Sequence, residues 1–355
     1  MKIKSLTLQN YKKFTSKKHI SFCDSDGEVN DVTLIIGNNG SGKSSILQAI
    51  TLLLASVIRE KFSPNTLDWS GFNYQYLQTG TLLPTVEASI IFSEEELKAT
   101  TQFATDLQSK GIKLDIPSCK SEVNLTLDYE DIKVKAIEGA KASFQFSGHQ
   151  YAKRLSQFTS NTASLFKNVG NIYWYNEQRN SYSLSNLLDS EVAQLDFIRS
   201  FLASTYSYHL AVTEKGREIR QGEFDFYEKL ETLYKLIFPN RSFVGVAPNF
   251  NLFEEAKAPS FFLSDGKNQY ELSGMSAGER AIFPILMDFA RWNINNSIII
   301  IDEIELHLHP PLQQALIRTL PKLGKNNQFI ITSHSNSVAS MFNEEENQII
   351  RLSNE

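Results

Sequence analysis

Two short motifs near opposite ends of the 355-residue chain constrain its fold more than any other feature. The first fits the pattern G-x-x-x-x-G-K-[ST] and reads Gly37-Asn38-Asn39-Gly40-Ser41-Gly42-Lys43-Ser44. The second is a run of four isoleucines that ends in Asp302 and Glu303. A glycine-rich turn between a strand and a helix, together with an acidic strand end, predicts a nucleotide-binding α/β fold. The long stretch between the motifs indicates that a second body is inserted into this fold.

Composition limits the class of protein without naming a function. A chain of this length buries roughly 75% of its unfolded surface, and about two domains are expected. The net charge of −5 argues against a uniformly basic nucleic-acid binder, although a local basic groove stays open. The two cysteines, Cys23 and Cys119, form no CxxC pair, which argues against a disulfide framework or a zinc site. Because no apolar run is long enough to span a membrane, we expect a cytoplasmic protein without membrane contact.

Residue periodicity predicts an α/β head with two kinds of sheet. The C-terminal quarter alternates helices and strands and predicts a parallel sheet, with strands at 297–301, 328–332 and 347–352 and helices at 276–292, 310–323 and 335–342. Pro284 is expected to kink the first of these helices. An antiparallel layer is predicted from strands at 3–8, 18–22, 85–92, 123–127, 132–137 and 142–146, with hairpin turns at 128–131 and 138–141 and a helix at 94–109.

The domain division follows from this pattern. Residues 1–183 are predicted to form the N-terminal part of the nucleotide-binding head, residues 184–240 an inserted helical lobe, and residues 241–355 the C-terminal part of the head. Residues 59–83 show no clear period and are predicted to be a loop.

The glycine-rich motif has the composition of a phosphate-binding loop. Glycine allows the backbone to approach oxygen atoms closely, and the following helix start presents free N–H groups to an anion. Lys43 is expected to reach the β- and γ-phosphates, and the Ser44 hydroxyl to bind Mg²⁺. The residues predicted to contact nucleotide here are Asn38, Asn39, Gly40, Ser41, Gly42, Lys43, Ser44 and Ser45.

The acidic strand end supplies the remaining chemistry for hydrolysis. Four consecutive β-branched residues predict a strand buried on both faces, and its carboxyl end is where open α/β sheets bind ligands. Asp302 is expected to hold Mg²⁺, and Glu303 to polarise the water that attacks the γ-phosphate. The two motifs together predict ATP and Mg²⁺ as cofactors and slow hydrolysis of ATP to ADP and phosphate.

Two further strings carry a family resemblance. Ser276-Ala277-Gly278-Glu279-Arg280 opens an apolar helix, where serine is a common N-cap. With a strand ending in Asp-Glu shortly afterwards, this string resembles the ABC-type signature motif, and the resemblance implies that Ser276, Gly278 and Glu279 meet nucleotide held by a second subunit. Thr332-Ser333-His334-Ser335 resembles the segment that carries the family's switch histidine, which implies that His334 contacts the γ-phosphate.

Two assignments complete the resemblance. Asn10-Tyr11-Lys12-Lys13-Phe14 resembles an N-terminal segment of the same ATPases, with Lys12 as the residue that would approach nucleotide. Gln178, in Asn176-Glu177-Gln178-Arg179, is the candidate for the glutamine that senses Mg²⁺. The alternating histidines His307 and His309 fit a turn into the next helix, and a separate metal site there is not expected.

In this order, the motifs resemble the SMC/RecF/OLD branch of ABC-type ATPases. The resemblance implies a homodimer that sandwiches two ATP molecules, or a higher oligomer, whose closure switches a partner effector such as a nuclease or toxin in bacterial anti-phage defence. The resemblance covers residues 1–58 and 270–355 well. The sequence departs from the family pattern because it shows no heptad pattern for coiled-coil arms and no nuclease domain. Two alternatives stay open, namely a RecF-like DNA-repair ATPase and a scaffold that binds ATP without hydrolysing it. The sequence does not identify the partner, and DNA contact remains open.

Overall fold

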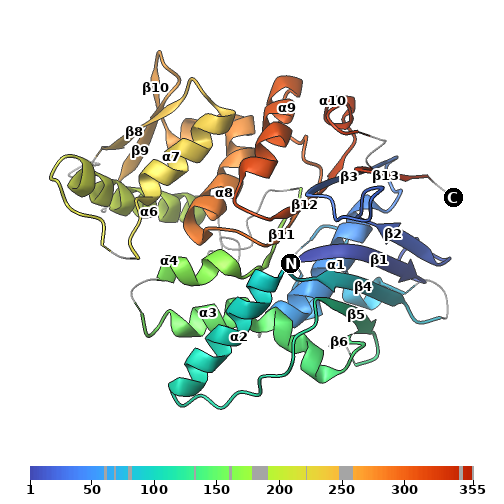
Figure 1. The fold of residues 1–355 in the computed structure, drawn as a ribbon. Coiled ribbons are helices and arrows are strands. Elements are labelled where there is room, and N and C mark those ends of the chain that lie inside the picture. The colour runs from blue at the N-terminus through green and yellow to red at the C-terminus, as the bar shows by residue number, and fades with distance from the viewer. Residues whose placement is uncertain are drawn as a thin grey trace.

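Five parallel strands form the centre of the molecule (Figure 1). The computed structural model describes residues 1–59, 62–67, 69–78, 82–131, 133–159, 162–177, 191–220, 222–247, 259–343 and 347–353. The central strands run in the order β13-β3-β12-β11-β7 and comprise Ile349–Leu352, Val32–Gly37, Gln328–Ser333, Ile298–Ile301 and Ile172–Tyr175. All four strand pairs are parallel. Every side chain of β11 is buried, which confirms the prediction from its four isoleucines.

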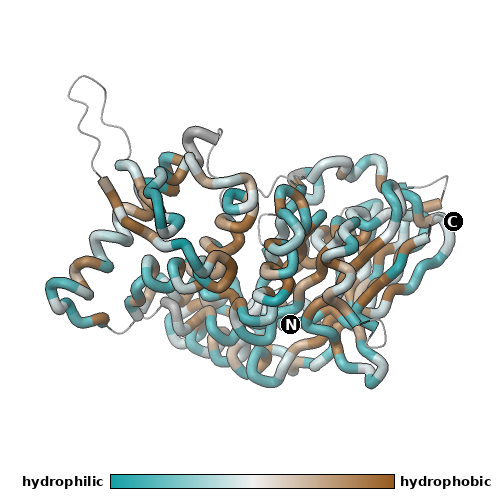
Figure 2. Tube along the Cα trace, turned by 90° about the horizontal axis from the view of Figure 1, so that it is seen from above, coloured by the Kyte–Doolittle hydropathy of each residue, from teal (hydrophilic) through white to brown (hydrophobic). Residues whose placement is uncertain are grey.

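The two faces of this sheet pack against different helices. Ile298 and Ile300 join the hydrophobic cluster that contains α1 (Lys43–Ile58), whereas Ile299 and Ile301 join the cluster that contains α7, α8 and α9. These three helices span Phe226–Ile237, Ala277–Trp292 and Pro310–Thr319. Alternate side chains of a strand point to opposite faces, so α1 and α8 lie on opposite faces of the sheet. Figure 2 shows the hydrophobic segments gathered in the interior strands and the hydrophilic ones along the outer loops.

An antiparallel sheet covers the other side of α1, as predicted. Its strand order is β2-β1-β4-β5-β6, with bounds Lys18–Ser21, Lys2–Gln9, Thr85–Ile91, Glu122–Asp128 and Lys133–Ala136. Helix α2 (Glu94–Ser109) follows β4 and begins with a capping box between Ser93 and Glu96. The predicted helix at 94–109 and the hairpin turn at 128–131 are therefore confirmed.

The strand predicted at 142–146 is wrong, and so is the hairpin turn at 138–141. Residues Ala140–Ser147 form the 3₁₀ helix η3, which leads into α3 (Gly148–Leu155). Phe146 packs in the α1 cluster, whereas Phe144 packs in a small cluster with α2 and α3. Residues two apart in a strand would face the same side, so a strand could not place these two rings in different clusters.

The C-terminal helices differ in length from the prediction. Helix α9 ends at Thr319 and continues as the 3₁₀ turn η6 (Leu320–Lys322), because Pro321 has no N–H to donate. Helix α10 comprises only Asn336–Ala339. Helix α8 runs on through Pro284 to Trp292.

Residues 184–240, predicted to be a helical lobe, contain α6 (Glu191–Thr213) and α7. An antiparallel sheet of order β10-β9-β8 (Gln269–Glu271, Ser260–Ser264 and Ser242–Ala247) packs beside them. Short elements complete the described chain: η1 (Pro64–Thr66), η2 (Tyr74–Tyr76), α4 (Thr162–Leu165), η4 (Phe166–Asn168) and η5 (Leu272–Gly274). Within the described ranges no helix combines the length and apolar character needed to cross a membrane.

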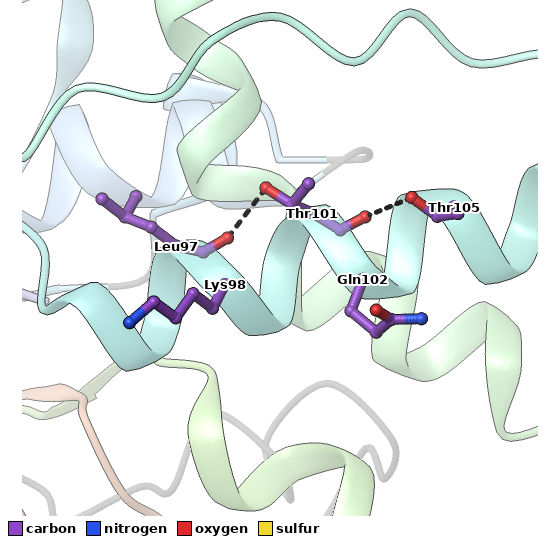
Figure 3. Close-up of a pocket in the computed structure, with 5 residues that line it drawn as sticks. All are labelled: Leu97, Lys98, Thr101, Gln102 and Thr105. Atoms are coloured by element: carbon purple, nitrogen blue, oxygen red, sulfur yellow. Dashed lines mark hydrogen bonds between the residues drawn. The ribbon is translucent and has the colours of Figure 1, made fainter.

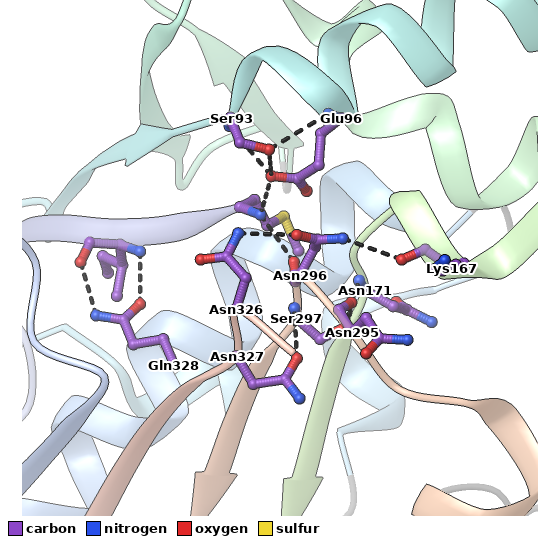
Figure 4. A network of polar contacts seen from close by, with 12 residues as sticks. Ser93, Glu96, Lys167, Asn171, Asn295, Asn296, Ser297, Asn326, Asn327 and Gln328 are labelled. Carbon is purple, nitrogen blue, oxygen red and sulfur yellow. Dashed lines mark hydrogen bonds and ion pairs between the residues drawn. The ribbon is translucent and has the colours of Figure 1, made fainter. Parts of the chain in front are cut away.

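A network of amide side chains closes the amino ends of the central strands (Figure 4). Gln328 exchanges two hydrogen bonds with the backbone of Ile3, at 2.7 and 2.9 Å, and thereby ties β12 to β1. Asn327 Oδ1 accepts the N–H of Ser297 at 3.0 Å, just before β11. The opposite, carboxyl ends of the strands are thus left to form the site.

Candidate functional site

The phosphate loop joins β3 to α1 and has the backbone conformation that its glycines predict. Gly40 and Gly42 have φ of 73° and 95°, in the left-handed region that favours glycine. A Cβ atom at Gly42 would also lie 2.8 Å from Cζ of Phe14. Helix α1 then begins with no side-chain cap and no acidic residue in its first turn. This helix start is therefore well suited to an anion.

Lys43 occupies the centre of the loop. Its Nζ donates to the carbonyl oxygens of Gly37, at 2.9 Å, and Asn38, at 3.1 Å. Burial lowers the pKa of Lys43, while the carboxylates of Asp302, Glu303 and Glu305 act in the opposite direction. The ammonium group thus lies near three carboxylates. It could exchange its backbone partners for phosphate oxygens.

The remaining loop residues divide by exposure. Asn38, Asn39 and Gly40 are exposed, and Ser44 and Ser45 are half-buried in the first turn of α1. Ser41 is buried, and its hydroxyl makes no hydrogen bond to any part of the chain that the structure describes.

Asp302 is held by donors from two distant segments. Its side chain is 2% exposed; Oδ1 accepts from the Thr332 hydroxyl at 2.5 Å and Oδ2 from Trp69 Nε1 at 3.1 Å. Thr332 lies on β12, between the strand that precedes the phosphate loop and the strand that ends at Asp302. Its hydroxyl also accepts the N–H of Glu303 at 2.7 Å. One threonine therefore fixes both acidic residues of the strand end.

Glu303 has the properties expected of a proton acceptor. Its φ is 47°, an uncommon backbone conformation for a residue other than glycine. Burial raises its pKa, and the nearby negative charges of Asp302 and Glu305 raise it further against the opposing effect of His334. A carboxylate with a raised pKa is a better general base near neutral pH.

Glu305 connects the strand end to His334. Its Oε1 accepts the backbone N–H of His334 at 2.5 Å, and the imidazole side chain of His334 is exposed. Its second oxygen, Oε2, is buried and has no hydrogen-bond partner among the described residues. The structure therefore brings together Lys43, Asp302, Glu303, Glu305 and His334, of which Glu305 was not predicted.

The donor set fits Mg²⁺. Among the described residues, no group of three or more His, Cys, Asp or Glu side chains could by itself hold a metal ion. Magnesium does not require one, because proteins usually hold it through one or two carboxylates, phosphate oxygens and water. Asp302 and the Ser44 hydroxyl would hold the ion, and the orphaned Glu305 oxygen is a further buried acceptor nearby. His309 instead caps α9, where its Nδ1 accepts the Leu312 N–H at 3.4 Å.

Ser276 is the N-cap of α8 and forms a capping box with Glu279. The Ser276 hydroxyl accepts the Glu279 N–H at 3.3 Å, and Glu279 Oε2 accepts the Ser276 N–H at 2.8 Å. Gly278 is buried, and a Cβ atom there would lie 2.8 Å from Leu312 Cδ2. Of the three residues predicted to meet nucleotide in this motif, only Ser276 has an exposed side chain.

The Glu279 side chain is buried, with 1% of its surface exposed, and other residues of the same chain bind its carboxylate. It forms an ion pair with Arg241 and accepts hydrogen bonds from the hydroxyls of Tyr234 and Tyr270. Burial by itself would raise the pKa of Glu279, and these hydrogen bonds outweigh it and lower the pKa to about 2. Glu279 therefore fixes the start of α8 against α7, β10 and Arg241, the residue before β8, which gives it a role in positioning Ser276.

Lys13 is a basic residue outside the motif that contacts the phosphate loop. Its Nζ donates to the Gly40 carbonyl oxygen. Lys12, the predicted residue, donates instead to Gln48 Oε1 and, at 2.9 Å, to the Gly71 carbonyl, and burial lowers its pKa to about 8. Gln178, the other predicted metal contact, lies outside the described residues.

Sequence reasoning missed Trp69, Thr332, Glu305 and Lys13. Glu305 and Thr332 stand within three residues of predicted site residues, so their positions offered a signal. Trp69 offered none, because it lies in the segment predicted to be a loop, and only the folded chain brings it to Asp302.

One surface hollow lies away from this site (Figure 3). It is lined by five residues of α2 alone: Leu97, Lys98, Thr101, Gln102 and Thr105. Its two threonine hydroxyls donate to carbonyls of their own helix, at 2.9 and 3.0 Å. The hollow therefore has no feature of a ligand site.

The fold and the site are those of a phosphate-loop ATPase domain. The chain belongs to the AAA ATPase domain family, whose model matches residues 1–339. In the solved structure of the "SmcHead bound to the C-winged helix domain of ScpA", the match covers 96% of this chain and 91% of the other, with 16% identity and a TM-score of 0.52. The predicted ATPase family and the α/β fold with parallel and antiparallel sheets are therefore confirmed.

Two curated relatives resemble the chain over nearly its whole length. The "Retron Vc95 probable ATPase" of Vibrio cholerae serotype O1 biovar El Tor is 23% identical, over 99% of this chain and 73% of the relative. The "Retron Ec83 probable ATPase" of Escherichia coli is 25% identical, over 95% of this chain and 69% of the relative.

Proposed function

We propose that the chain binds Mg²⁺ and ATP at the phosphate loop and hydrolyses ATP slowly to ADP and phosphate. The convergence of Lys43, Asp302 and Glu303 at the carboxyl edge of the parallel sheet carries this proposal. Lys43 and the start of α1 bind the β- and γ-phosphates, and Asp302 and Ser44 hold the metal ion. When bound there, Mg²⁺ would supply positive charge to offset the charge that develops on the phosphate oxygens.

In this proposal, Glu303 accepts the proton of the attacking water. Its raised pKa and its position beside Asp302 support the role. The backbone N–H of His334 donates to Glu305, which holds this residue in place. In the proposal, the His334 side chain contacts the γ-phosphate. The imidazole is exposed on the edge of the site, where a phosphate could reach it.

We further propose that two chains close head to head around two ATP molecules. The arrangement of α1 and α8 on opposite faces of the sheet supports this model, because the phosphate loop begins one helix and Ser276 begins the other. Ser276 is exposed at a helix start, where its hydroxyl and backbone can face phosphate on a second chain. Gly278 allows α8 to pack closely on α9 behind it.

ATP-dependent closure of this dimer is proposed to switch or hold a partner effector. The two relatives are named as probable ATPases of retrons, and this resemblance supports a role beside a partner. Helix α7, strand β10 and Arg241, which precedes β8, contact α8 through the buried Glu279. Helix α6 contacts α8 through Arg291, which lies over the rings of Phe197 and Phe201. These elements are therefore proposed to pass closure of the dimer to the partner.

The variant Glu303→Gln tests the proposal. It removes the general base and keeps a side chain of nearly equal shape, so the protein should bind ATP, lose hydrolysis and accumulate as a dimer. Size-exclusion chromatography with light scattering, with ATP and with ADP, measures the mass, and phosphate release measures turnover. Lys43→Ala is the matched control, which should stay a monomer with either nucleotide. A Glu303→Gln protein that stays a monomer with ATP would refute the sandwich, and wild-type turnover at background would support the non-hydrolysing scaffold instead.

A further inference from the structure

Trp69 reaches the metal-binding carboxylate from a part of the chain that the motifs do not include. It lies between η1 and η2, after α1, and is 4% exposed. Its indole Nε1–H donates to Asp302 Oδ2 at 3.1 Å, although the two residues are 233 positions apart in the chain. A buried tryptophan needs a partner for its N–H, and here that partner is the carboxylate expected to hold Mg²⁺.

The Asp302 carboxylate is fixed on both of its oxygens. Thr332 donates to Oδ1 at 2.5 Å and Trp69 donates to Oδ2 at 3.1 Å. An ionised carboxylate has about four lone-pair positions, so one donor on each oxygen is compatible with a metal ligand. Hydrogen bonds of this outer kind orient a ligand and commonly change metal affinity by about 10- to 100-fold.

The backbone beside Trp69 is attached to the helix that begins at the phosphate loop. Gln48, a residue of α1 that is 1% exposed, donates through Nε2 to the Ser70 carbonyl at 3.2 Å. Lys12 donates to the Gly71 carbonyl at 2.9 Å and lies 5.4 Å from the centre of the Phe72 ring. The segment Trp69–Phe72 is thus held to α1 at one side while its indole holds Asp302 at the other.

We propose that Trp69 is a positioning residue for the metal site: its indole N–H holds the Asp302 carboxylate in a fixed orientation for Mg²⁺. The segment Trp69–Phe72 thereby links α1, where phosphate binds, to the end of β11, where the metal binds. This role rests on the proposed function.

The experiment measures metal binding directly and needs no turnover. Mn²⁺ replaces Mg²⁺, and its electron paramagnetic resonance signal reports free Mn²⁺ in the presence of the full chain and ADP. Trp69→Phe should weaken Mn²⁺ binding by about 10- to 100-fold. ADP binding in EDTA, measured by calorimetry, should stay within about twofold because the phosphate loop is intact. Trp292→Phe is the matched control, since Trp292 is 37% exposed at the end of α8, and it should leave both affinities unchanged.

A second variant separates the hydrogen bond from packing. In a chain with Trp174→Phe and Trp292→Phe, benzothienylalanine at position 69 keeps the ring shape and removes the N–H. Mn²⁺ binding should weaken as in Trp69→Phe, whereas unchanged binding would overturn the proposal. An equal loss of metal-free ADP binding in both variants would also overturn it, because Trp69 would then act through general packing. If the wild-type chain with ADP binds no Mn²⁺, the proposed function itself fails. If the wild-type chain binds Mn²⁺ and the Trp69 variants bind it with the same affinity, the proposed function stands and this inference fails.

Discussion

Neutralising Glu279 should destabilise the protein by about 3 kcal/mol at neutral pH. Glu279 is 1% exposed and receives hydrogen bonds or charge from Arg241, Tyr234, Tyr270 and the Ser276 N–H. Its pKa lies at about 2, against an ordinary value of 4.5. At about 1.4 kcal/mol for each pKa unit, the ionised form is favoured in the folded state by about 3 kcal/mol. Glu279→Gln removes the charge with little change of shape and should forfeit this amount.

The effect of Glu279→Gln on the unfolding free energy should depend on pH. Because the folded-state pKa is lowered, the stabilisation is fully present above pH 4.5 and is lost as the pH falls through about 2. The difference in unfolding free energy between wild type and Glu279→Gln should therefore shrink from about 3 kcal/mol at pH 7 to about 1.5 kcal/mol at pH 3. Urea denaturation followed by tryptophan emission at both pH values measures this difference.

Glu303→Gln is the matched control for the charge argument. The pKa of Glu303 is raised, so its ionised form is disfavoured in the folded state, and neutralising it should leave stability at pH 7 unchanged or increased. A loss of less than about 1 kcal/mol in Glu279→Gln, or a loss that does not change with pH, would refute the assignment of Glu279 as a buried, ionised anchor.

Two further pairs of variants test the site. Gly42→Ala combines a φ of 95° with a Cβ atom 2.8 Å from Phe14, so this variant should lose ADP binding in calorimetry. Gly40→Ala has a φ of 73° and no atom within 4 Å of the new Cβ, so it should lose only about 1–2 kcal/mol of stability in urea denaturation. Equal effects of the two variants would contradict the packing argument. Thr332→Val removes hydrogen bonds to both residues of the acidic strand end and should lower phosphate release by about 10- to 100-fold. Thr33→Val, at a buried hydroxyl without a partner in the described chain, should keep turnover and gain about 1 kcal/mol, and a loss of stability there would argue for a missed partner.

The chemistry of the site could be predicted because it depends on local sequence. Gly40 and Gly42 have the positive φ that their motif requires, and Asp302 follows a strand that four isoleucines bury completely. Ser276 caps a helix that its neighbours make apolar. Each of these features is set within a few residues, so periodicity and motif spacing were sufficient.

The partners of these residues could not be predicted, because they come from distant parts of the chain. Nothing near Trp69 indicates that it will meet Asp302, since that contact depends on how the segment after α1 folds back over the sheet. Lys12 and Lys13 are adjacent, and only the backbone turn, with a φ of 50° at Lys12, decides which one reaches Gly40. The alternation of Phe144 and Phe146 predicts a strand, but in the folded chain the two rings pack in different hydrophobic clusters.

Mixing two inactive variants tests the central claim, that each complete ATP site contains residues of two chains. Lys43→Ala removes phosphate binding, and Ser276→Arg blocks the start of α8, so each variant alone should show no turnover. In a mixed dimer, one site combines both substitutions and the other has an intact phosphate loop and an intact Ser276. An equimolar mixture should therefore recover phosphate release that neither variant shows alone, up to about a quarter of the wild-type rate, which is the value for random pairing with one working site in each mixed dimer. A mixture as inactive as its components, with mixed dimers shown by co-purification through a tag on one variant only, would contradict the account.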